Sequence, residues 1–203
     1  MFKGSMVAIV TPFKRDKVDE KTLAGLVEFH IKNGTSAIVP CGTTGESATL
    51  SYEEHEHVIE LVVKTANKRV AVIAGTGSNN TREAIILTKY AKDVGADASL
   101  QVSPYYNKPT QEGLYKHFKK IAEEVGLPLI VYNIASRTGV NILPETMERL
   151  SKVKNIVGVK EASGNLEQMS RIHALCGNNF DLISGDDVLT FPLLAIGGQV
   201  SYQ

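Results

Sequence analysis

The sequence predicts an α/β fold of the TIM (β/α)8 barrel type, and three observations carry this prediction. Short β-branched runs alternate with amphipathic helical patterns at a spacing of about thirty residues. The runs are nearly all apolar, which is typical of parallel strands that are buried on both faces. Seven such strand and helix units follow one another, and this succession favours a barrel over an open doubly wound sheet.

Each strand is expected where β-branched and apolar residues run together, and each helix where apolar residues recur with the helical period. The expected strands are 6–11, 36–41, 69–74, 98–103, 128–132, 156–160 and 180–184. The helices that follow them in turn are 20–32, 52–66, 81–94, 110–125, 144–150, 165–175 and 188–196. No linker, low-complexity tract or charge block marks a boundary, so residues 1–203 are expected to form a single barrel domain.

Composition favours a globular protein that acts on small molecules. Of the 203 residues, 43% are hydrophobic and 22% are charged, and the net charge is zero with both signs interleaved. This pattern carries no electrostatic footprint for nucleic acid or for an anionic membrane. The N-terminus lacks the long apolar region of a signal peptide, and no apolar stretch is long enough to span a membrane. A cytoplasmic location is therefore expected.

Lys160 stands inside an otherwise apolar strand, the run from Ile156 to Glu161. Because strand side chains alternate, Ile156, Gly158 and Lys160 are expected on one face, with an empty slot at Gly158 beside the lysine stem. An ammonium group in apolar surroundings loses its proton more easily and becomes a Schiff-base nucleophile. The alternative is that the strand ends near Val159 and that Lys160 only reaches solvent.

Polar clusters follow the carboxyl ends of several strands, where barrel enzymes place their sites. In 42–47, glycines, successive amides and hydroxyls can hold a carboxylate, although a turn with a helix N-cap is an alternative. The segment 75–81 is a weaker candidate for ligand binding, because it can also be a loop that ends in a helix cap. Segments 103–109 and 132–139 bring tyrosines and an arginine to the same end of the barrel as Lys160. This set of side chains suits enamine chemistry on carboxylate substrates. Individually, a packed tyrosine and a loop-capping arginine remain alternatives.

No metal centre or redox pair is expected. Cys41 and Cys176 lie in segments that are expected to be buried, which favours inert thiols. His55 and His57 are two apart on an expected helix, so they point in different directions and are expected to be solvated. The acidic pair 186–187 could bind a cation, but a helix N-cap is the favoured interpretation.

In their order and context, four motifs resemble those of the dihydrodipicolinate synthase family of pyruvate-dependent Schiff-base aldolases. The resemblance runs from residue 1 to about residue 198. The motifs are Gly-Thr-Thr-Gly-Glu-Ser at 42–47, Pro-Tyr-Tyr-Asn-Lys-Pro at 104–109, Tyr-Asn at 132–133 with Ser-Arg-Thr-Gly at 136–139, and Val-Lys-Glu-Ala at 159–162. The resemblance implies a lyase of lysine and diaminopimelate biosynthesis.

The resemblance also implies a role for each residue of the site. Lys160 would form the Schiff base with pyruvate, Tyr132 would donate and accept protons, and Thr43 would be its relay partner. Tyr106 would complete the relay from across a dimer interface. The family assembles as a dimer of dimers, so a homotetramer is expected.

Two further residues would hold the substrates: Thr44 the pyruvate carboxylate, and Arg137 the second substrate, L-aspartate 4-semialdehyde. No metal or separate cofactor is implied. A sibling sugar-acid aldolase is an alternative, although Arg137 and the paired tyrosines at 105–106 argue against it. A catalytically impaired fragment or binding protein is a second alternative.

The resemblance further implies a regulatory site for lysine. Tyr52 replaces the histidine of sensitive bacterial members, a change that is expected to weaken or remove the response to lysine. The residues at matching positions are Ser47, Ala48, His55, Asn79, Glu83 and Tyr105.

The C-terminal residues 197–203 depart from the family pattern. A complete barrel typically needs about 250 residues, and the family adds a helical C-terminal region. The eighth unit and that region are therefore expected to be missing, as in a truncated or partial chain. In that case the first and seventh strands would present unpaired edges.

Overall fold

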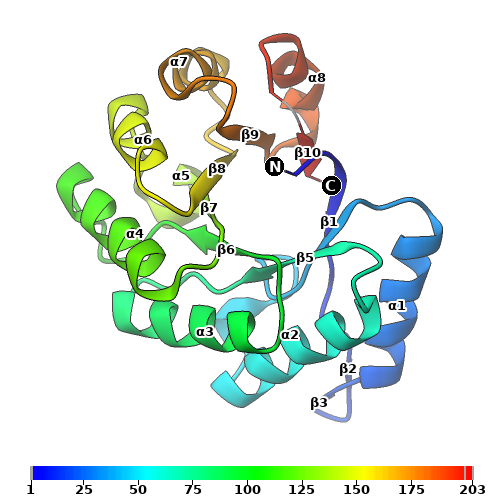
Figure 1. Cartoon of the computed structure of the whole chain (residues 1–203). Helices are drawn as coiled ribbons and strands as arrows, with labels where there is room; N and C mark the ends of the chain where they lie inside the picture. The colour runs from blue at the N-terminus through cyan, green and yellow to red at the C-terminus, as the bar shows by residue number, and fades with distance from the viewer. Residues whose placement is uncertain (1, 199, 203) are drawn as a thin grey trace.

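The computed structural model describes residues 2–198 and 200–202. Within these residues eight parallel strands form a closed barrel with the spatial order β1-β10-β9-β8-β7-β6-β5-β4 (Figure 1). The strands are Gly4–Ala8 (β1), Ala37–Val39 (β4), Ala71–Gly75 (β5), Ala98–Val102 (β6), Leu129–Asn133 (β7), Ile156–Glu161 (β8), Asp181–Ser184 (β9) and Val200–Tyr202 (β10). The predicted TIM-barrel class is confirmed.

Helices surround the barrel (Figure 1), and each of the seven predicted helices lies within one residue of its expected bounds. They are Glu20–Lys32 (α1), Tyr52–Ala66 (α2), Thr81–Asp93 (α3), Gln111–Val125 (α4), Pro144–Ser151 (α6), Leu166–Cys176 (α7) and Asp187–Ala195 (α8). A four-residue helix, Ala135–Thr138 (α5), and a 3-10 turn, Ser47–Thr49 (η1), were not predicted. None of the described helices is long and apolar enough to cross a membrane.

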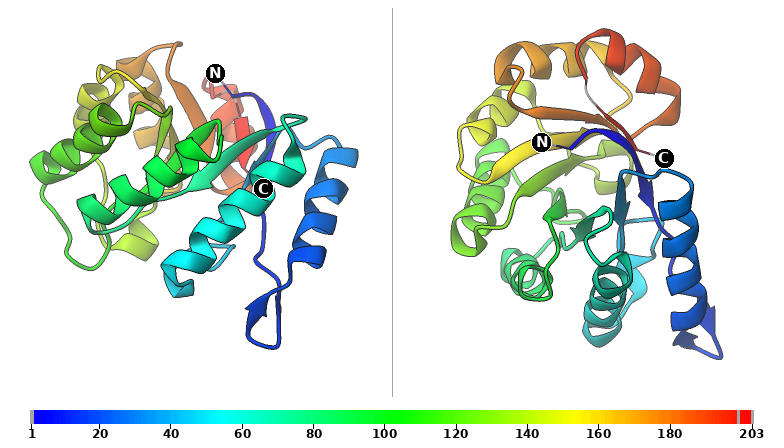
Figure 2. Two further views of the ribbon diagram at one scale, coloured as in Figure 1. Left: turned by 60° about the horizontal axis from the view of Figure 1, so that its bottom comes forward. Right: turned by 45° about the vertical axis from the view of Figure 1, so that its right-hand side comes forward.

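A two-stranded hairpin, Phe13–Lys14 (β2) and Lys17–Val18 (β3), interrupts the first unit and projects past the end of α1 (Figure 2). Its two turn residues, Arg15 and Asp16, have positive φ values of 53° and 58°, as a two-residue hairpin turn with the favoured twist requires. The predicted strand 6–11 therefore ends at Ala8.

The expectation of unpaired barrel edges is wrong. β10 pairs in parallel with β1 on one side and with β9 on the other, in the registers Gly4↔Val200 and Val200↔Ile183. Three residues of extended backbone are enough for this pairing, and they supply the eighth strand that was expected to be missing. β10 is the last element of the described residues.

Two apolar cores explain why the strands are apolar along their whole length. In β7, Ile130 and Tyr132 point into the barrel, whereas Leu129 and Val131 pack in the larger core between the sheet and the helices. This alternation with a period of two is that of a strand buried on both faces.

β8 breaks the alternation before it reaches Lys160. Its pairing with β7 slips by one residue, so that Leu129 pairs with Ile156 but Ile130 pairs with Gly158. As a result Ile156 belongs to the outer core, and its predicted place on the face of Lys160 is wrong. The predicted empty slot at Gly158 is also wrong, because a Cβ atom there would lie 2.5 Å from the carbonyl oxygen of Asp181.

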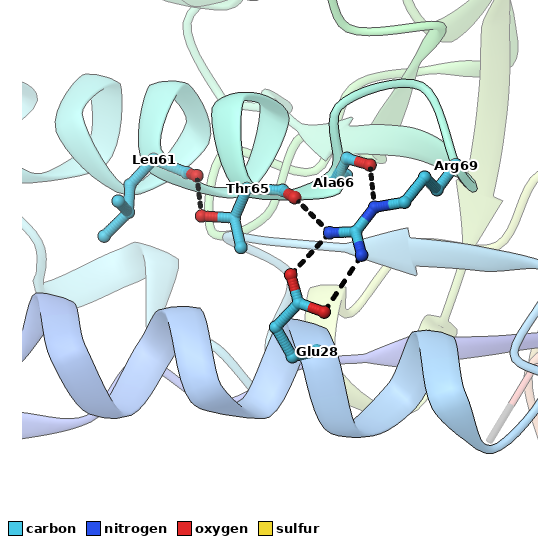
Figure 3. Close-up of polar contacts among 5 residues, drawn as sticks. All are labelled: Glu28, Leu61, Thr65, Ala66 and Arg69. Atoms are coloured by element: carbon cyan, nitrogen blue, oxygen red, sulfur yellow. Dashed lines mark hydrogen bonds and ion pairs between the residues drawn. The ribbon is translucent and has the colours of Figure 1, made fainter.

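Arg69 ties the first two helices together (Figure 3). Its guanidinium group donates to the carbonyl oxygens of Thr65 (2.7 Å) and Ala66 (3.1 Å) at the end of α2 and to the carboxylate of Glu28 on α1 (2.9 Å). A cation at this position also satisfies carbonyl groups that the helix itself leaves unpaired.

Candidate active site

Lys160 and Tyr132 lie side by side on the inner face of the barrel. They are paired in the register of β7 and β8, and the Lys160 Nζ atom lies 4.3 Å from the centroid of the Tyr132 ring. Lys160 is only 7% exposed and Tyr132 only 6%. The alternative that Lys160 merely reaches solvent is therefore wrong.

The surroundings of both groups change their proton affinity. Burial lowers the pKa of Lys160 to about 7, and the negative charge of Asp187 partly opposes this effect. Burial raises the pKa of Tyr132, whereas a hydrogen bond with Thr43 and the charge of Arg137 lower it. At neutral pH a large fraction of Lys160 is thus a neutral amine, next to a phenol that keeps its proton.

A cavity of about 400 Å³ opens above this pair. Lys160 and Tyr132 form its buried floor, and exposed side chains form its rim. Five of the predicted catalytic and substrate-binding residues line it together. The lining residues are Ala8, Gly42, Thr43, Thr44, Leu100, Tyr132, Ile134, Arg137, Lys160, Gly185 and Asp187.

The loop 42–47 places Thr43 and Thr44 at the rim. Gly45 serves the packing of this loop, because a Cβ atom there would lie 3.0 Å from the carbonyl oxygen of Ile9. The helix that follows is capped by Ser51, whose side chain accepts from the backbone N–H of Glu54. The alternative of a turn with an N-cap is right about the turn at 43–46 and wrong about the cap of α2, which is Ser51. Glu46 precedes η1 without a side-chain capping bond, and Thr43 and Thr44 line the cavity.

Arg137 reaches the rim from α5. Gly139 ends this short helix with a φ of 73°, a left-handed conformation that favours glycine. A Cβ atom at Gly139 would lie 2.7 Å from the Cε atom of Lys108. The loop that carries Tyr106 thus packs against the loop that carries Arg137.

Asp187 and Gly185 belong to the site but were not predicted to do so. Asp186 is the N-cap of α8, since its Oδ1 atom accepts from the N–H of Val188 (3.1 Å), and this part of the prediction is confirmed. Asp187, however, lines the cavity and acts on Lys160. A Cβ atom at Gly185 would lie 3.0 Å from the Lys160 Cε atom, so glycine leaves room for the lysine stem. The sequence did contain a signal for both residues, since a glycine and an acidic residue directly after a barrel strand are typical of an active-site loop.

Tyr106 is not among the residues that line this cavity. Its side chain is 90% exposed, and its φ of 68° is uncommon for a bulky residue. Such strain often marks functional loops. Within one chain, therefore, the structure does not bring Tyr106 together with Lys160, and its predicted role needs a second subunit.

Most of the predicted regulatory residues line a second cavity, of about 210 Å³. They are Ser47, Ala48, His55, Glu83 and Tyr105. Asn79 does not line it but donates from Nδ2 to the carbonyl oxygen of Tyr105 (3.3 Å). Tyr52 lines it as well, and burial together with a hydrogen bond to the Glu83 carboxylate raises the pKa of Tyr52.

The prediction that His55 is solvated is wrong. His55 is only 5% exposed, its Nε2 atom lies 2.7 Å from the carbonyl oxygen of Gly75, and burial lowers its pKa. His57 points elsewhere, with its Nε2 atom 2.9 Å from the Glu20 Oε1 atom. Predicted burial is confirmed for Cys41, whereas Cys176 is only half-buried. Among the described residues no group of three or more His, Cys, Asp or Glu side chains could hold a metal ion.

Comparison with known proteins confirms the resemblance in the sequence. The model of the Dihydrodipicolinate synthetase family matches residues 1–202. A 4-hydroxy-tetrahydrodipicolinate synthase of Geotalea daltonii is 64% identical over 199 residues, which are 98% of this chain and 69% of that protein.

Solved structures agree with this match. The crystal structure of dihydrodipicolinate synthase from Aquifex aeolicus has a TM-score of 0.98 and 55% identity, and the match covers all of this chain and 69% of that one. The chloride-inhibited enzyme from Acinetobacter baumannii, solved in complex with pyruvate, has a TM-score of 0.97 and 52% identity, with 100% and 70% covered. This chain belongs to the dihydrodipicolinate synthetase family.

Proposed function

We propose that this chain is a 4-hydroxy-tetrahydrodipicolinate synthase, a lyase that condenses pyruvate with L-aspartate 4-semialdehyde in lysine and diaminopimelate biosynthesis. The observation that carries the proposal is Lys160, a buried lysine with a pKa of about 7 on the floor of a cavity. The names of the relatives supply the reaction.

The reaction begins at Lys160, whose neutral amine attacks the keto carbon of pyruvate and forms an imine with loss of water. Thr43 and Thr44 line the same cavity, and because amide and hydroxyl groups can hold a carboxylate, we assign Thr44 to the pyruvate carboxylate. No metal or separate cofactor takes part in this scheme.

Proton transfer falls to Tyr132, the phenol beside Lys160. It donates its proton to the hydroxyl group that leaves as water when the imine forms, and the resulting phenolate accepts a proton from the methyl group as the imine becomes an enamine. The phenol then donates its proton to the alkoxide that forms when the enamine carbon attacks the aldehyde. Its hydrogen bond with Thr43 provides the first step of a relay to solvent. Arg137, at the rim, binds the carboxylate of the aldehyde substrate. The substrate's own amine then displaces Lys160, which closes the ring and frees the enzyme.

We also propose a homo-oligomer, a dimer of dimers, in the cytoplasm. The support is the exposed, strained Tyr106, which is suited to complete the relay in a neighbouring subunit. Lysine is proposed to bind the second cavity, where Glu83 offers a carboxylate to a cationic amino acid.

The test is a comparison of aldehydes. Turnover of pyruvate with L-aspartate 4-semialdehyde is expected, and turnover with sugar-derived aldehydes is not. Arg137→Ala should raise KM for the aldehyde while leaving pyruvate trapping on Lys160 intact, because Arg137 belongs to the second substrate. Preference for a sugar-derived aldehyde would assign the site to a sibling aldolase. Equal loss of both steps in Arg137→Ala would contradict the assignment of Arg137 to the second substrate.

A further inference from the structure

A buried polar cluster lies directly behind the reactive pair, on the outer face of the barrel. Asn133 follows Tyr132 on β7 and Glu161 follows Lys160 on β8, and these two outer residues are themselves paired in the register. Because strand side chains alternate, the pair that faces the cavity has this second pair at its back. Glu161 is 0% exposed and is not among the residues that line the cavity.

In each described hydrogen bond of its side chain, Glu161 is the acceptor. Asn133 Nδ2 lies 3.1 Å from Oε2, Gln168 Nε2 lies 3.3 Å from Oε2, and the backbone N–H of Ser163 lies 2.8 Å from Oε1. Burial raises the pKa of Glu161, whereas hydrogen bonds from the side chain and backbone of Ser163, from Asn133 and from Gln168 lower it. The donor geometry fits a carboxylate that accepts on every side.

The same cluster fixes the loop that carries Arg137. Asn133 closes this loop, because its Oδ1 atom accepts from the N–H of Ile142 (3.0 Å) and its Nδ2 atom donates to Asn141 Oδ1 (2.8 Å). Asn141 in turn donates to Gln168 Oε1 on α7 (2.8 Å). One network therefore joins the ends of β7 and β8, the Arg137 loop and α7.

We propose that Glu161 is a positioning residue for the reaction assigned above: as the shared acceptor of Asn133, Gln168 and Ser163, it holds Lys160 in register with Tyr132. The inference rests on the proposed function, since positioning matters only where Lys160 reacts. Misplacement of reacting groups by about 1 Å can lower a rate about a hundred-fold.

Glu161→Gln removes the charge at nearly constant size and presents an amide N–H₂ to groups that are donors. Gln168→Glu places a second carboxylate against the first. In the double variant Glu161→Gln/Gln168→Glu the new amide at position 161 donates to the new carboxylate at position 168, and Asn133 and Ser163 still reach the acceptor at Oε1 of position 161. The double variant loses the second bond of Gln168 Nε2, to Asn141 Oδ1 (3.2 Å). We expect each single variant to lower kcat about ten- to a hundred-fold with little change in KM. The double variant should recover part of the loss, because it restores the contact between positions 161 and 168 but not the bond to Asn141 Oδ1.

Thr88→Val is the matched control. Thr88 is also almost fully buried (1% exposed), on α3, and accepts from Gln101 Nε2 (2.8 Å). Neither residue is among those that line the cavity. We expect it to lower Tm but to leave kcat unchanged. The inference is overturned if Glu161→Gln has wild-type kcat, or if its loss of kcat is fully explained by the fraction of unfolded protein. It is also overturned if the kcat of the double variant is no higher than that of the single variants.

A second readout does not need the proposed reaction. The pH dependence of Lys160 acylation by acetic anhydride, read by peptide mass spectrometry, reports the pKa of Lys160, which Tyr132 and Asp187 face. Loss of register admits water, so in Glu161→Gln this pKa should rise above the wild-type value of about 7 and move back toward that value in the double variant. An unchanged or lowered pKa contradicts positioning. If the wild type forms no pyruvate adduct, the proposed function fails, while this titration still decides the role of Glu161.

Discussion

Replacing Lys160 by methionine should make the protein more stable while destroying its reactive amine. The substitution keeps an unbranched side chain of similar length in the floor of the cavity. It removes a group whose charged form is out of place there, because Lys160 is almost fully buried and lies over the ring of Tyr132. Functional sites commonly carry such a cost in stability.

The magnitude follows from the pKa of Lys160, which falls from an ordinary 10.5 to about 7. Each pKa unit corresponds to about 1.4 kcal/mol, which sets an upper limit of about 5 kcal/mol on the cost of the charged form. Because the pKa of this base is lower in the folded state, the folded chain loses the Lys160 proton near pH 7, whereas the unfolded chain keeps it up to about pH 10.5. The cost is therefore fully present below about pH 7 and is relieved as the pH rises toward 10.5.

Urea unfolding at two pH values measures this effect. We expect Lys160→Met to have the higher free energy of unfolding at pH 7, and its advantage to shrink by about 2 kcal/mol between pH 7 and pH 9. Lys89→Met, which replaces an exposed lysine on α3, is the control and should differ from the wild type equally at both pH values. An advantage of Lys160→Met that does not change with pH would refute the reasoning.

Four further outcomes are expected. Tyr132→Phe should lower kcat about a hundred-fold or more with the fold intact, measured by steady-state turnover and circular dichroism, because a positioned acid and base is lost; a near-normal kcat would contradict its role. Gly185→Ala should slow adduct formation at Lys160, followed by borohydride quenching over time, because the new methyl group would lie 3.0 Å from Cε; an unchanged rate would show that the stem has room. Mixing Tyr106→Phe with Lys160→Ala subunits should restore turnover through mixed dimers, and complete absence of complementation would confine the tyrosine to its own subunit. Millimolar lysine should inhibit turnover, and Glu83→Gln should weaken that inhibition; activity unchanged by lysine would reject regulation.

Much of the barrel could be predicted because its elements carry local patterns. The helices recur with a clear apolar period, and all seven lie within one residue of expectation. β10 was missed because a three-residue strand carries no period, and its pairing with β1 and β9 is decided by the tertiary structure. The slip in β8 that moves Ile156 to the outer core is likewise a property of strand pairing.

The site was predictable to the extent that it follows from topology. Lys160, Tyr132 and Arg137 meet because the carboxyl ends of parallel strands share one face of the barrel. Asp187 was hidden because the same position also suits the start of a helix. The burial of His55 depends on the packing of α2 against β5, which a helical period alone does not show.

Borohydride reduction in the presence of pyruvate tests the central claim most directly. Peptide mass spectrometry should find one reduced pyruvate on the peptide that contains Lys160, with more adduct as the pH rises through about 7, and none in Lys160→Ala. An adduct that persists in Lys160→Ala, or one on another lysine of the wild type, would contradict the assignment of Lys160 as the Schiff-base residue.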